Sequence, residues 1–300
     1  MNNAIIIFTY NRPRHLNQLL LSLEENKVST NQKIYLFCDG PKNKKDLNKI
    51  NEIKKILKKT KLKISKKIFR KKNVGLSQNI LKGVSLILKK YDSCIVIEDD
   101  LLLNSSTIKY MEKMLHMFKN QERIGSISAY SYLQNYKKFK NKQFYITKRH
   151  CSWCWGTWSR VWNKFDWDQI DYSKHFSNDN EIKNFSEAGS DLNLLLWGHY
   201  KSYINSWAIR FNYFCYKHKY LSLQPRFSMV LNNGQDSSGT HEKFKLIKNS
   251  DYNFHPKLRE KSIILRKIVN SKDIDEFIKK NHKRSLRLSL KYILENKKII

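Results

Sequence analysis

The sequence predicts an α/β protein whose Rossmann-like, mostly parallel sheet is flanked by helices. Short β-rich runs alternate with segments of helical period through the first third of the chain. Strands joined by connections of helix length pair in parallel through right-handed crossovers. The 300 residues are 40% hydrophobic and 13% aromatic, so the chain can bury a sizeable core. This composition excludes a disordered or low-complexity protein.

The first third supplies five strands and four helices. The expected strands are short runs rich in apolar residues: Ala4–Tyr10, Lys33–Cys38, Lys66–Phe69, Ser93–Ile97 and Ile124–Ala129. The expected helices carry apolar residues at a period of about 3.6: Pro13–Glu25, Asp46–Lys59, Leu76–Lys90 and Ser105–Lys119. Asp39-Gly40-Pro41 and Asn73-Val74-Gly75 are turn signals between these elements.

The pattern changes from about Phe144 onward. Five tryptophans crowd into the segment from Trp153 to Trp167, and helix candidates follow at 190–201 and 207–217. A polar loop at 232–241 and a basic, helical C-terminal extension come last. We divide the chain into residues 1–130, 131–250 and 251–300. Because no Pro- or Gly-rich linker separates the first two parts, we expect them to pack as one unit.

The charge of the chain limits the function classes without deciding among them. The net charge is +32, and it is uneven: Pro41–Lys72 holds 15 basic and 2 acidic residues, and Pro256–Ile300 holds 14 and 5. An anionic partner would explain the excess, whether nucleic acid, an anionic membrane face or a phosphorylated substrate. A general drift of composition toward Lys, Asn and Ile explains it equally well.

No segment predicts a membrane span or secretion. No run reaches the roughly 18 apolar residues of a span. The start Met1-Asn2-Asn3 lacks the basic region and the cleavage site of a signal peptide. We therefore expect a cytoplasmic chain, with its five cysteines as reduced thiols. Cys151 and Cys154 form a C-x-x-C without a second ligand pair, which favours core packing over zinc.

Polar residues follow four of the predicted strands. Ligands of an open parallel sheet bind outside the carboxyl ends of its strands. The residues there are Thr9–Arg12, Asp39-Gly40, Asn73–Gly75 and Glu98-Asp99-Asp100. Three adjacent acids repel one another, and Mg²⁺ or Mn²⁺ would remove that penalty. The acids could instead cap the next helix. Their convergence with the other residues favours a cation that bridges a carboxylate to a diphosphate.

An ordered set of motifs resembles the GT-A fold nucleotide-sugar glycosyltransferases. The closer resemblance is to bacterial family-2-type sugar transferases, and it extends to the animal N-acetylglucosaminyltransferase group. Glu98-Asp99-Asp100 stands where the family has its acidic "DXD" signature. Six further segments match family motifs in the same order: Phe8–Pro13, Cys38–Asn43, Asn73–Leu76, Ser152–Trp158, Ser206–Arg210 and Ser238–His241. The similarity spans about residues 4–245 and leaves out the C-terminal stretch.

The resemblance implies a role for each matched residue. Asp100 would ligate the Mn²⁺ or Mg²⁺ ion, while Glu98 and Asp99 would hold sugar and ribose hydroxyls. Asp39 would contact the uracil ring. His241 would complete the metal shell or donate to a phosphate, unless it simply lies in solvent. The other implied nucleotide contacts are Thr9, Asn11, Arg12 and Asn73, together with Ser238, Gly239 and Thr240 in a loop that closes over the diphosphate.

The resembled group inverts the sugar in one displacement, which requires a base for the acceptor hydroxyl and no enzyme nucleophile. The motif's Asp ahead of Ser-Trp is Asn205 here, and Asn cannot accept a proton at neutral pH. Asp191, Glu187 and Asp236 are the candidate substitutes. Asp191 ranks first because it opens the helix that would line the acceptor side. Otherwise the protein is slow or inactive, or the register is off by one residue.

Two apolar features each have two interpretations. Trp155 and Trp158 could stack on sugar faces or belong to an aromatic core, and we expect these two roles to be divided between them. The segment Ser285–Glu295 carries Leu286, Leu290 and Ile293 on one side. It could dock on the domain as a terminal helix or lie on an anionic membrane surface.

We therefore expect a metal-dependent hexosyl- or N-acetylhexosaminyl-transferase. It would carry sugar from a UDP-sugar to a glycan or lipid-linked acceptor in lipopolysaccharide or capsule assembly, in the cytoplasm or peripherally on the cytoplasmic membrane face. Two other classes stay open. A nucleic-acid-binding protein would pair its basic residues with exposed aromatics. A sugar-nucleotide nucleotidyltransferase would show a Gly-rich phosphate loop, which Thr9–Arg14 lacks.

Overall fold

The computed structural model describes residues 2–28, 31–133, 136, 144–167, 169–234, 272–282 and 286–296. Its first half is the predicted alternation of strands and helices: β1 (Asn3–Thr9), α1 (Pro13–Glu25), β2 (Lys33–Cys38), α2 (Lys44–Lys59), β3 (Ile64–Phe69), α3 (Leu76–Leu88), β4 (Ser93–Glu98), α4 (Thr107–Met117) and β6 (Ile124–Ser128). The five strands and four helices expected there are confirmed, and their ends differ from the expected ones by no more than two residues.

The sequence did not reveal β5 (Leu101–Leu103), a short strand of the first half. The second half adds four more short strands: β7 (Phe144–Thr147), β8 (Trp155–Trp158), β9 (Leu221–Pro225) and β10 (Val230–Asn232). Its helical elements are α5 (Ser159–Trp162), α6 (Tyr172–Phe176), α7 (Asp179–Phe185), η1 (Ser186–Ala188), α8 (Leu192–Tyr200), α9 (Trp207–Lys217), α10 (Lys272–Asn281) and α11 (Leu286–Asn296). The helix candidates at 190–201 and 207–217 are confirmed as α8 and α9.

One eight-stranded sheet runs through both halves in the order β3-β2-β1-β4-β8-β6-β9-β7. The strands β3, β2, β1 and β4 are parallel, as predicted. β8 is antiparallel to both of its neighbours, β4 and β6, so a strand from the second half lies between two strands of the first. The boundary expected near residue 130 therefore does not separate two sheets.

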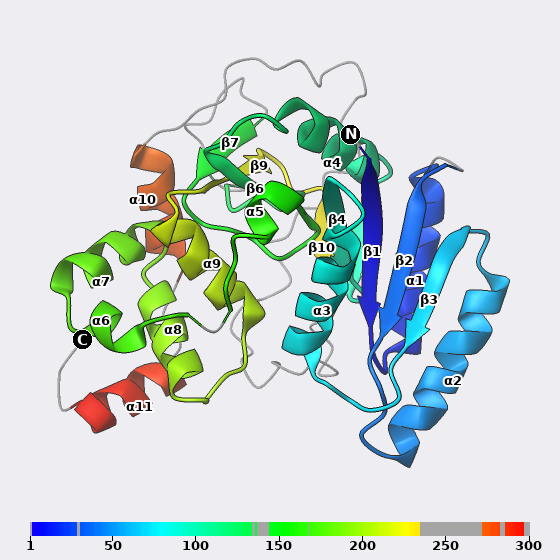
Figure 1. Ribbon diagram of the computed structural model, residues 1–300, viewed down its shortest axis with the longest axis horizontal. Helices are drawn as coiled ribbons and strands as arrows, with labels where there is room; N and C mark the ends of the chain where they lie inside the picture. Colours follow the sequence, from blue (N-terminus) through cyan, green and yellow to red (C-terminus); the bar gives the residue numbers. More distant parts are fainter. Residues whose placement is uncertain are drawn as a thin grey trace.

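The helices of the first half cover both faces of the parallel strands. Figure 1 shows α1 and α2 together on one side of β1 and α3 on the other. This arrangement follows from the strand order, because the right-handed crossovers to β2 and β3 run in one direction and the crossover to β4 runs in the other. β1 and β4 are buried on both faces, which explains their continuous apolar runs.

The tryptophan-rich segment is core. Trp155 and Trp158 are 0% and 2% exposed, and Trp155 stacks on Trp207 with ring centroids 5.0 Å apart. The expectation that one of the pair stacks on sugar faces is therefore wrong, and the aromatic-core interpretation is confirmed for both. Cys151 and Cys154 are buried free thiols, and no group of metal-ligating side chains forms around them within the described residues.

The two C-terminal helices dock on the second half. Ile274 and Ile278 of α10 pack with Leu133 and Tyr145, and Leu288 of α11 packs with Leu194 and Trp197 of α8. Docking of the terminal helix is thus confirmed, but on a different face than expected, because Leu290 is 61% exposed. Among the described residues, no helix combines the length and the apolar character needed to cross a membrane.

The packing of α3 against β1 depends on Gly83. A Cβ atom there would lie 2.6 Å from the ring of Phe8, which is buried and stacks on Phe37. We expect Gly83→Ala to lower the free energy of unfolding by about 1–3 kcal/mol through overpacking, measured by urea denaturation. Leu86→Ala on the exposed side of the same helix is the control, with an expected change within about 0.5 kcal/mol. Equal effects of the two substitutions would contradict this packing.

Candidate functional site

The strand order reverses between β1 and β4, and the predicted acidic residues lie at that point. β1 pairs with β2 on one side and with β4 on the other, so the connections leave in opposite directions. Such a switch point leaves a crevice outside the carboxyl ends of the strands. Phe8 pairs with Glu98 in the last register position. Thr9 and Asp99 follow directly, and the Thr9 hydroxyl donates to Asp99 Oδ2 at 2.7 Å.

Asp100 is paired with Arg12 from the loop after β1. Arg12 Nη1 lies 3.0 Å from Asp100 Oδ2, and the side chains are only 13% and 19% exposed. The Tyr10 amide also reaches the triplet, donating to Asp99 Oδ2 at 3.3 Å. The predicted convergence of the β1 loop with the acidic triplet is thus present in the structure.

A third segment, at 232–234, reaches the same place from the end of the second half. β10 pairs antiparallel with β5, which follows the triplet, and the Asn233 amide donates to the backbone oxygen of Asp100 at 2.7 Å. A Cβ atom on Gly234 would lie 2.6 Å from Asp100 Oδ2. Only glycine lets the backbone come this close to the carboxylate, and the motif loop predicted to close over a diphosphate begins a few residues later.

Burial and neighbouring carboxylates raise the pKa of two of the three carboxyl groups, Glu98 and Asp99. Burial, followed by the charges of Asp100 and Asp99, raises the pKa of Glu98 to about 8. Burial and the charge of Asp100 raise the pKa of Asp99 to about 6, although the hydrogen bond from Thr9 and the charge of Arg12 oppose this. One arginine therefore does not balance the triplet, and a further cation would be stabilising here.

The donor set suits a hard divalent cation that shares its coordination with phosphate. Within the described part of the chain, no group of three or more His, Cys, Asp and Glu residues is arranged to hold a metal ion. Mg²⁺ and related ions are commonly held by one or two carboxylates, with the remaining positions left to substrate phosphates and water. The carboxylate of Asp100 fits that role. His241, the other predicted ligand, lies outside the described residues.

Asp39 holds a turn. Its Oδ1 accepts from the amides of Gly40 and Val74 at 2.8 and 2.9 Å, and its Oδ2 accepts from the Gly75 amide at 2.9 Å. The Asn73 side chain donates to the backbone oxygen of Gly40 at 2.9 Å and closes the same turn. These bonds connect the end of β2 to the start of α3. The predicted contact of Asp39 with a uracil ring would use only the acceptor capacity that these hydrogen bonds leave.

Asp46 is a site residue that was expected only to begin a helix. Its carboxylate accepts from Tyr10 Oη at 2.6 Å, from Asn11 Nδ2 at 2.6 Å and from the Lys42 amide at 3.1 Å. It therefore joins the loop after β1 to the loop after β2. Burial alone would raise the pKa of Asp46, but the hydrogen bonds from Tyr10, Asn11 and Lys42 outweigh it and lower the pKa. The available signal was a lone acid at the start of a lysine-rich helix.

Asp191, the first-ranked base candidate, is engaged in a buried ion pair. Arg149 Nη1 and Nη2 lie 2.7 and 2.9 Å from its two carboxylate oxygens. Burial raises the pKa of Asp191, but the charge of Arg149 and the hydrogen bonds from it lower the pKa further, so that the net shift is downward. A carboxylate whose oxygens both bind a guanidinium and whose pKa is depressed is a weak proton acceptor. This geometry disfavours Asp191 as the base.

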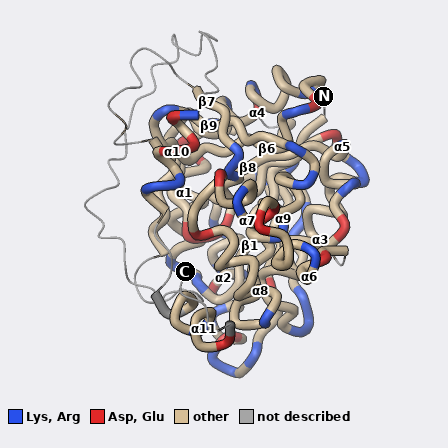
Figure 2. The backbone as a smooth tube through the Cα atoms, turned by 90° about the vertical axis from the view of Figure 1, so that its left-hand side faces the viewer, with Lys and Arg blue, Asp and Glu red and all other residues tan. Residues whose placement is uncertain are grey.

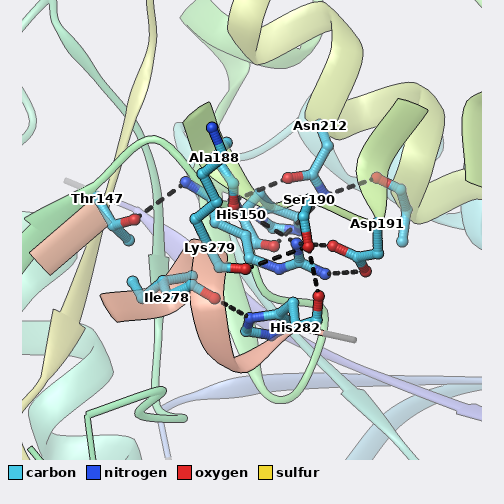
Figure 3. Close-up of polar contacts among 11 residues, drawn as sticks. Thr147, His150, Ala188, Ser190, Asp191, Asn212, Ile278, Lys279 and His282 are labelled. Carbon is cyan, nitrogen blue, oxygen red and sulfur yellow. Dashed lines mark hydrogen bonds and ion pairs between the residues drawn. The ribbon is translucent and has the colours of Figure 1, made fainter. Parts of the chain in front are cut away.

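The pair belongs to a junction between the second half and α10. Figure 3 shows Asp191 beside Ser190, whose hydroxyl donates to the backbone oxygens of Lys279 and His282 at 3.2 and 2.7 Å. A Cβ atom on Gly189 would lie 2.0 Å from Arg149 Nη1, so the turn before Asp191 leaves room only for glycine. The whole cluster positions α10 on the protein.

The remaining base candidates are placed as follows. Asn205 is exposed, and Ser206 after it caps α9 by accepting from the Ile209 amide. Glu187 forms an exposed ion pair with Lys148. Asp236 lies outside the described residues, as do Ser238, Gly239 and Thr240. The structure therefore brings Thr9, Arg12 and the triplet together and leaves the base unassigned.

Comparison with known proteins gives similarity to solved structures only. No family model matches the chain, and no curated protein does. S. aureus TarS 1-349 is 15% identical, with a TM-score of 0.38, over 55% of this chain and 49% of that one. A mannosyltransferase from Pyrobaculum calidifontis, in complex with GDP-Man and Mn²⁺, is 10% identical, with a TM-score of 0.37, over 54% and 46%.

A third match is glucosyl-3-phosphoglycerate synthase from Mycobacterium tuberculosis with Mg²⁺ and UDP. It is 7% identical, with a TM-score of 0.34, over 53% of this chain and 57% of that one. The matched region thus spans about half the length of each of these structures. At these scores the similarity is no basis for assigning an activity.

The link made by Asp46 predicts a measurable loss of stability. Asp46→Asn removes an anionic acceptor from three donors, so we expect the free energy of unfolding at neutral pH to fall by about 1–3 kcal/mol. Because the folded pKa is depressed, this contribution is full above the ordinary Asp pKa of 3.8 and is lost as the pH falls through the folded value. The gap between wild type and variant should therefore narrow below pH 3.8, as measured by urea midpoints. A difference in the free energy of unfolding that does not change with pH would contradict this role of Asp46.

The ion pair predicts that Asp191 contributes to stability, not to proton transfer. Asp191→Asn leaves the Arg149 charge buried without a counter-ion, so we expect a loss of about 3–5 kcal/mol of folding stability. The double variant Arg149→Met/Asp191→Leu removes both charges and should recover most of the loss. If Asp191→Asn instead kept the wild-type melting temperature and lost turnover, Asp191 would be the base after all.

Proposed function

We propose that the chain is a metal-dependent GT-A glycosyltransferase that uses a nucleotide sugar. The observation that carries the proposal is the meeting of Thr9, Arg12 and Glu98-Asp99-Asp100 at the switch point between β1 and β4. A site of this kind combines anionic oxygens for a cation with a guanidinium for a phosphate. These are the two groups needed to hold a diphosphate leaving group.

Each residue of this edge has a role in the proposal. Asp100 would hold a Mn²⁺ or Mg²⁺ ion, which stabilises negative charge on the leaving diphosphate. Arg12 lies within reach of the same place and would contact the phosphates. Thr9 and the Tyr10 amide hold Asp99 in position, and Asp99 and Glu98 would bind the sugar and ribose hydroxyls. Asp39 and Asn73 stabilise the neighbouring turn, which would contact the nucleobase.

The finer assignment rests on the sequence resemblance. The donor would be a UDP-sugar, and inversion would occur in one displacement, without an enzyme nucleophile. The acceptor would be a glycan or a lipid-linked molecule of lipopolysaccharide or capsule assembly at the cytoplasmic membrane face. The acceptor hydroxyl must lose its proton during attack. Since Asn205 cannot take it and Asp191 is held by Arg149, Glu187 and Asp236 are the candidates that remain.

A thermal-shift panel tests the proposal. UDP-, GDP- and CMP-sugars are compared with and without Mn²⁺, and we expect one nucleotide class to raise the melting temperature only when the metal is present. Ligand at about 100 times its Kd stabilises the folded state by about 2.7 kcal/mol. Asp100→Asn should abolish the metal-dependent rise in melting temperature. Glu122→Gln changes an exposed acid just before β6 and should leave that rise unchanged. No stabilisation by any sugar nucleotide, combined with binding to DNA, would favour the nucleic-acid-binding class.

A further inference from the structure

The segment Pro41–Lys72 concentrates exposed lysines on α2, on β3 and on the turns beside them. We name its exposed lysines the lysine face; they are Lys42, Lys44, Lys45, Lys54, Lys55, Lys58, Lys59, Lys61, Lys63, Lys66, Lys67, Lys71 and Lys72. Glu52 is the one exposed acid of this segment, because Asp46 is buried by its contacts with the loops. The charge excess here is therefore a property of one surface, not only of the whole composition.

Helix α2 and strand β3 form this surface together. α2 buries Ile50, Ile53 and Leu57 toward the protein and turns its lysines outward. Among the strands that the structure describes, β3 stands at the edge of the sheet and is paired with β2 alone. Contacts join the two elements directly: Lys54 Nζ lies 5.3 Å from the centroid of the Phe69 ring, and Lys67 Nζ donates to the Leu57 backbone oxygen at 3.1 Å.

The opposite end of the molecule is different. Figure 1 shows α2 and β3 at the end of the molecule away from α10 and α11. Figure 2, which views that other end, shows acidic and basic segments interspersed along the backbone. A composition drift toward lysine would add positive charge everywhere, so it does not account for a surface with a single exposed acid. Charge of one sign on one surface is the pattern of attraction to a polyanion.

The chemistry of the face favours lipid headgroups over nucleic acid. Its exposed basic residues are all lysines, and Arg70, the one arginine of the segment, donates from Nε to Asn79 Oδ1. Its one aromatic side chain, Phe69, is partly buried and lies beneath Lys54. Base-specific nucleic-acid sites use arginine forks, and single-strand sites use exposed aromatic rings for stacking. Lysine clusters without either are typical of diffuse attraction to anionic membranes.

We propose that the lysine face holds the protein against an anionic phospholipid bilayer. This role is independent of the transferase proposal, because it concerns a different surface and predicts binding without any sugar nucleotide. It also differs from the membrane interpretation of the terminal helix, because α11 uses Leu288 to dock on α8.

Vesicle co-sedimentation of the full chain tests this inference. The vesicles are pure phosphatidylcholine or equal parts phosphatidylcholine and phosphatidylglycerol. The test variant is Lys55→Gln/Lys58→Gln/Lys59→Gln/Lys61→Gln/Lys63→Gln, which leaves Lys54 and Lys67 in their contacts. The matched control changes the same number of exposed lysines elsewhere: Lys89→Gln/Lys90→Gln/Lys119→Gln/Lys164→Gln/Lys183→Gln. Both variants have the same net charge.

We expect wild type to sediment with the anionic vesicles only and to be released by salt, which screens such attraction within about 8 Å at physiological ionic strength. The lysine-face variant should bind at least tenfold more weakly, and the control should stay within twofold of wild type. Equal losses in the two variants, or equal binding of wild type to both vesicles, would overturn the proposal. So would a lysine-face variant that loses binding to duplex DNA but not to vesicles.

Acetylation footprinting of the wild-type chain tests the same proposal without any substitution, so it remains informative if the variant does not fold. Anionic vesicles should reduce acetylation of Lys55, Lys58 and Lys63 several-fold, as measured by mass spectrometry. Acetylation of Lys89 and Lys164 should not change. Protection spread evenly over both sets of lysines would reject a specific face.

Discussion

The pairing of β1 with β4 forces three carboxyl groups together at one edge of the sheet, and much of the surrounding structure offsets their repulsion. Thr9 and the Tyr10 amide bind Asp99, Arg12 pairs with Asp100, and the backbone at Asn233 fixes the start of β5. Even so, burial and mutual repulsion raise the pKa of Glu98 to about 8. Negative charge thus remains uncompensated at this edge after all of these contacts. A site of this kind is suited to bind a cation together with an anion.

The sequence was sufficient for the parallel half because two periodicities alternate there without conflict. Apolar runs such as Ile5–Ile7 need burial on both faces, and the helical stripes of α1 and α3 supply it. The second half was not predictable in the same way. β8 is four residues of Trp, Gly and Thr with no alternation, and it is a strand only because β4 and β6 both pair with it. Such strands are fixed by their tertiary neighbours.

The residues of the site were predictable where they lie at the ends of strands. They were not predictable where a side chain bonds to a residue far away in the sequence. Thr9, Arg12 and the triplet follow from strand order. Asp191 looked available because it opens the helix that was expected to line the acceptor side, yet Arg149, 42 positions earlier, binds both of its carboxylate oxygens. Asp46 looked like a helix start, yet it anchors Tyr10, 36 positions earlier. A carboxylate's function depends on its donors, and spacing along the chain does not show them.

The most direct measurement is a Mn²⁺ titration followed by electron paramagnetic resonance, in which bound ions lose the signal of free Mn²⁺. With UDP present, wild type should remove one equivalent of Mn²⁺ from solution, and Asp100→Asn should leave the signal close to that of buffer. Binding by wild type should be weaker without UDP, because the diphosphate supplies part of the coordination. Equal Mn²⁺ binding by wild type and Asp100→Asn, or none by either, would contradict the assignment of this edge as the site of a shared cation.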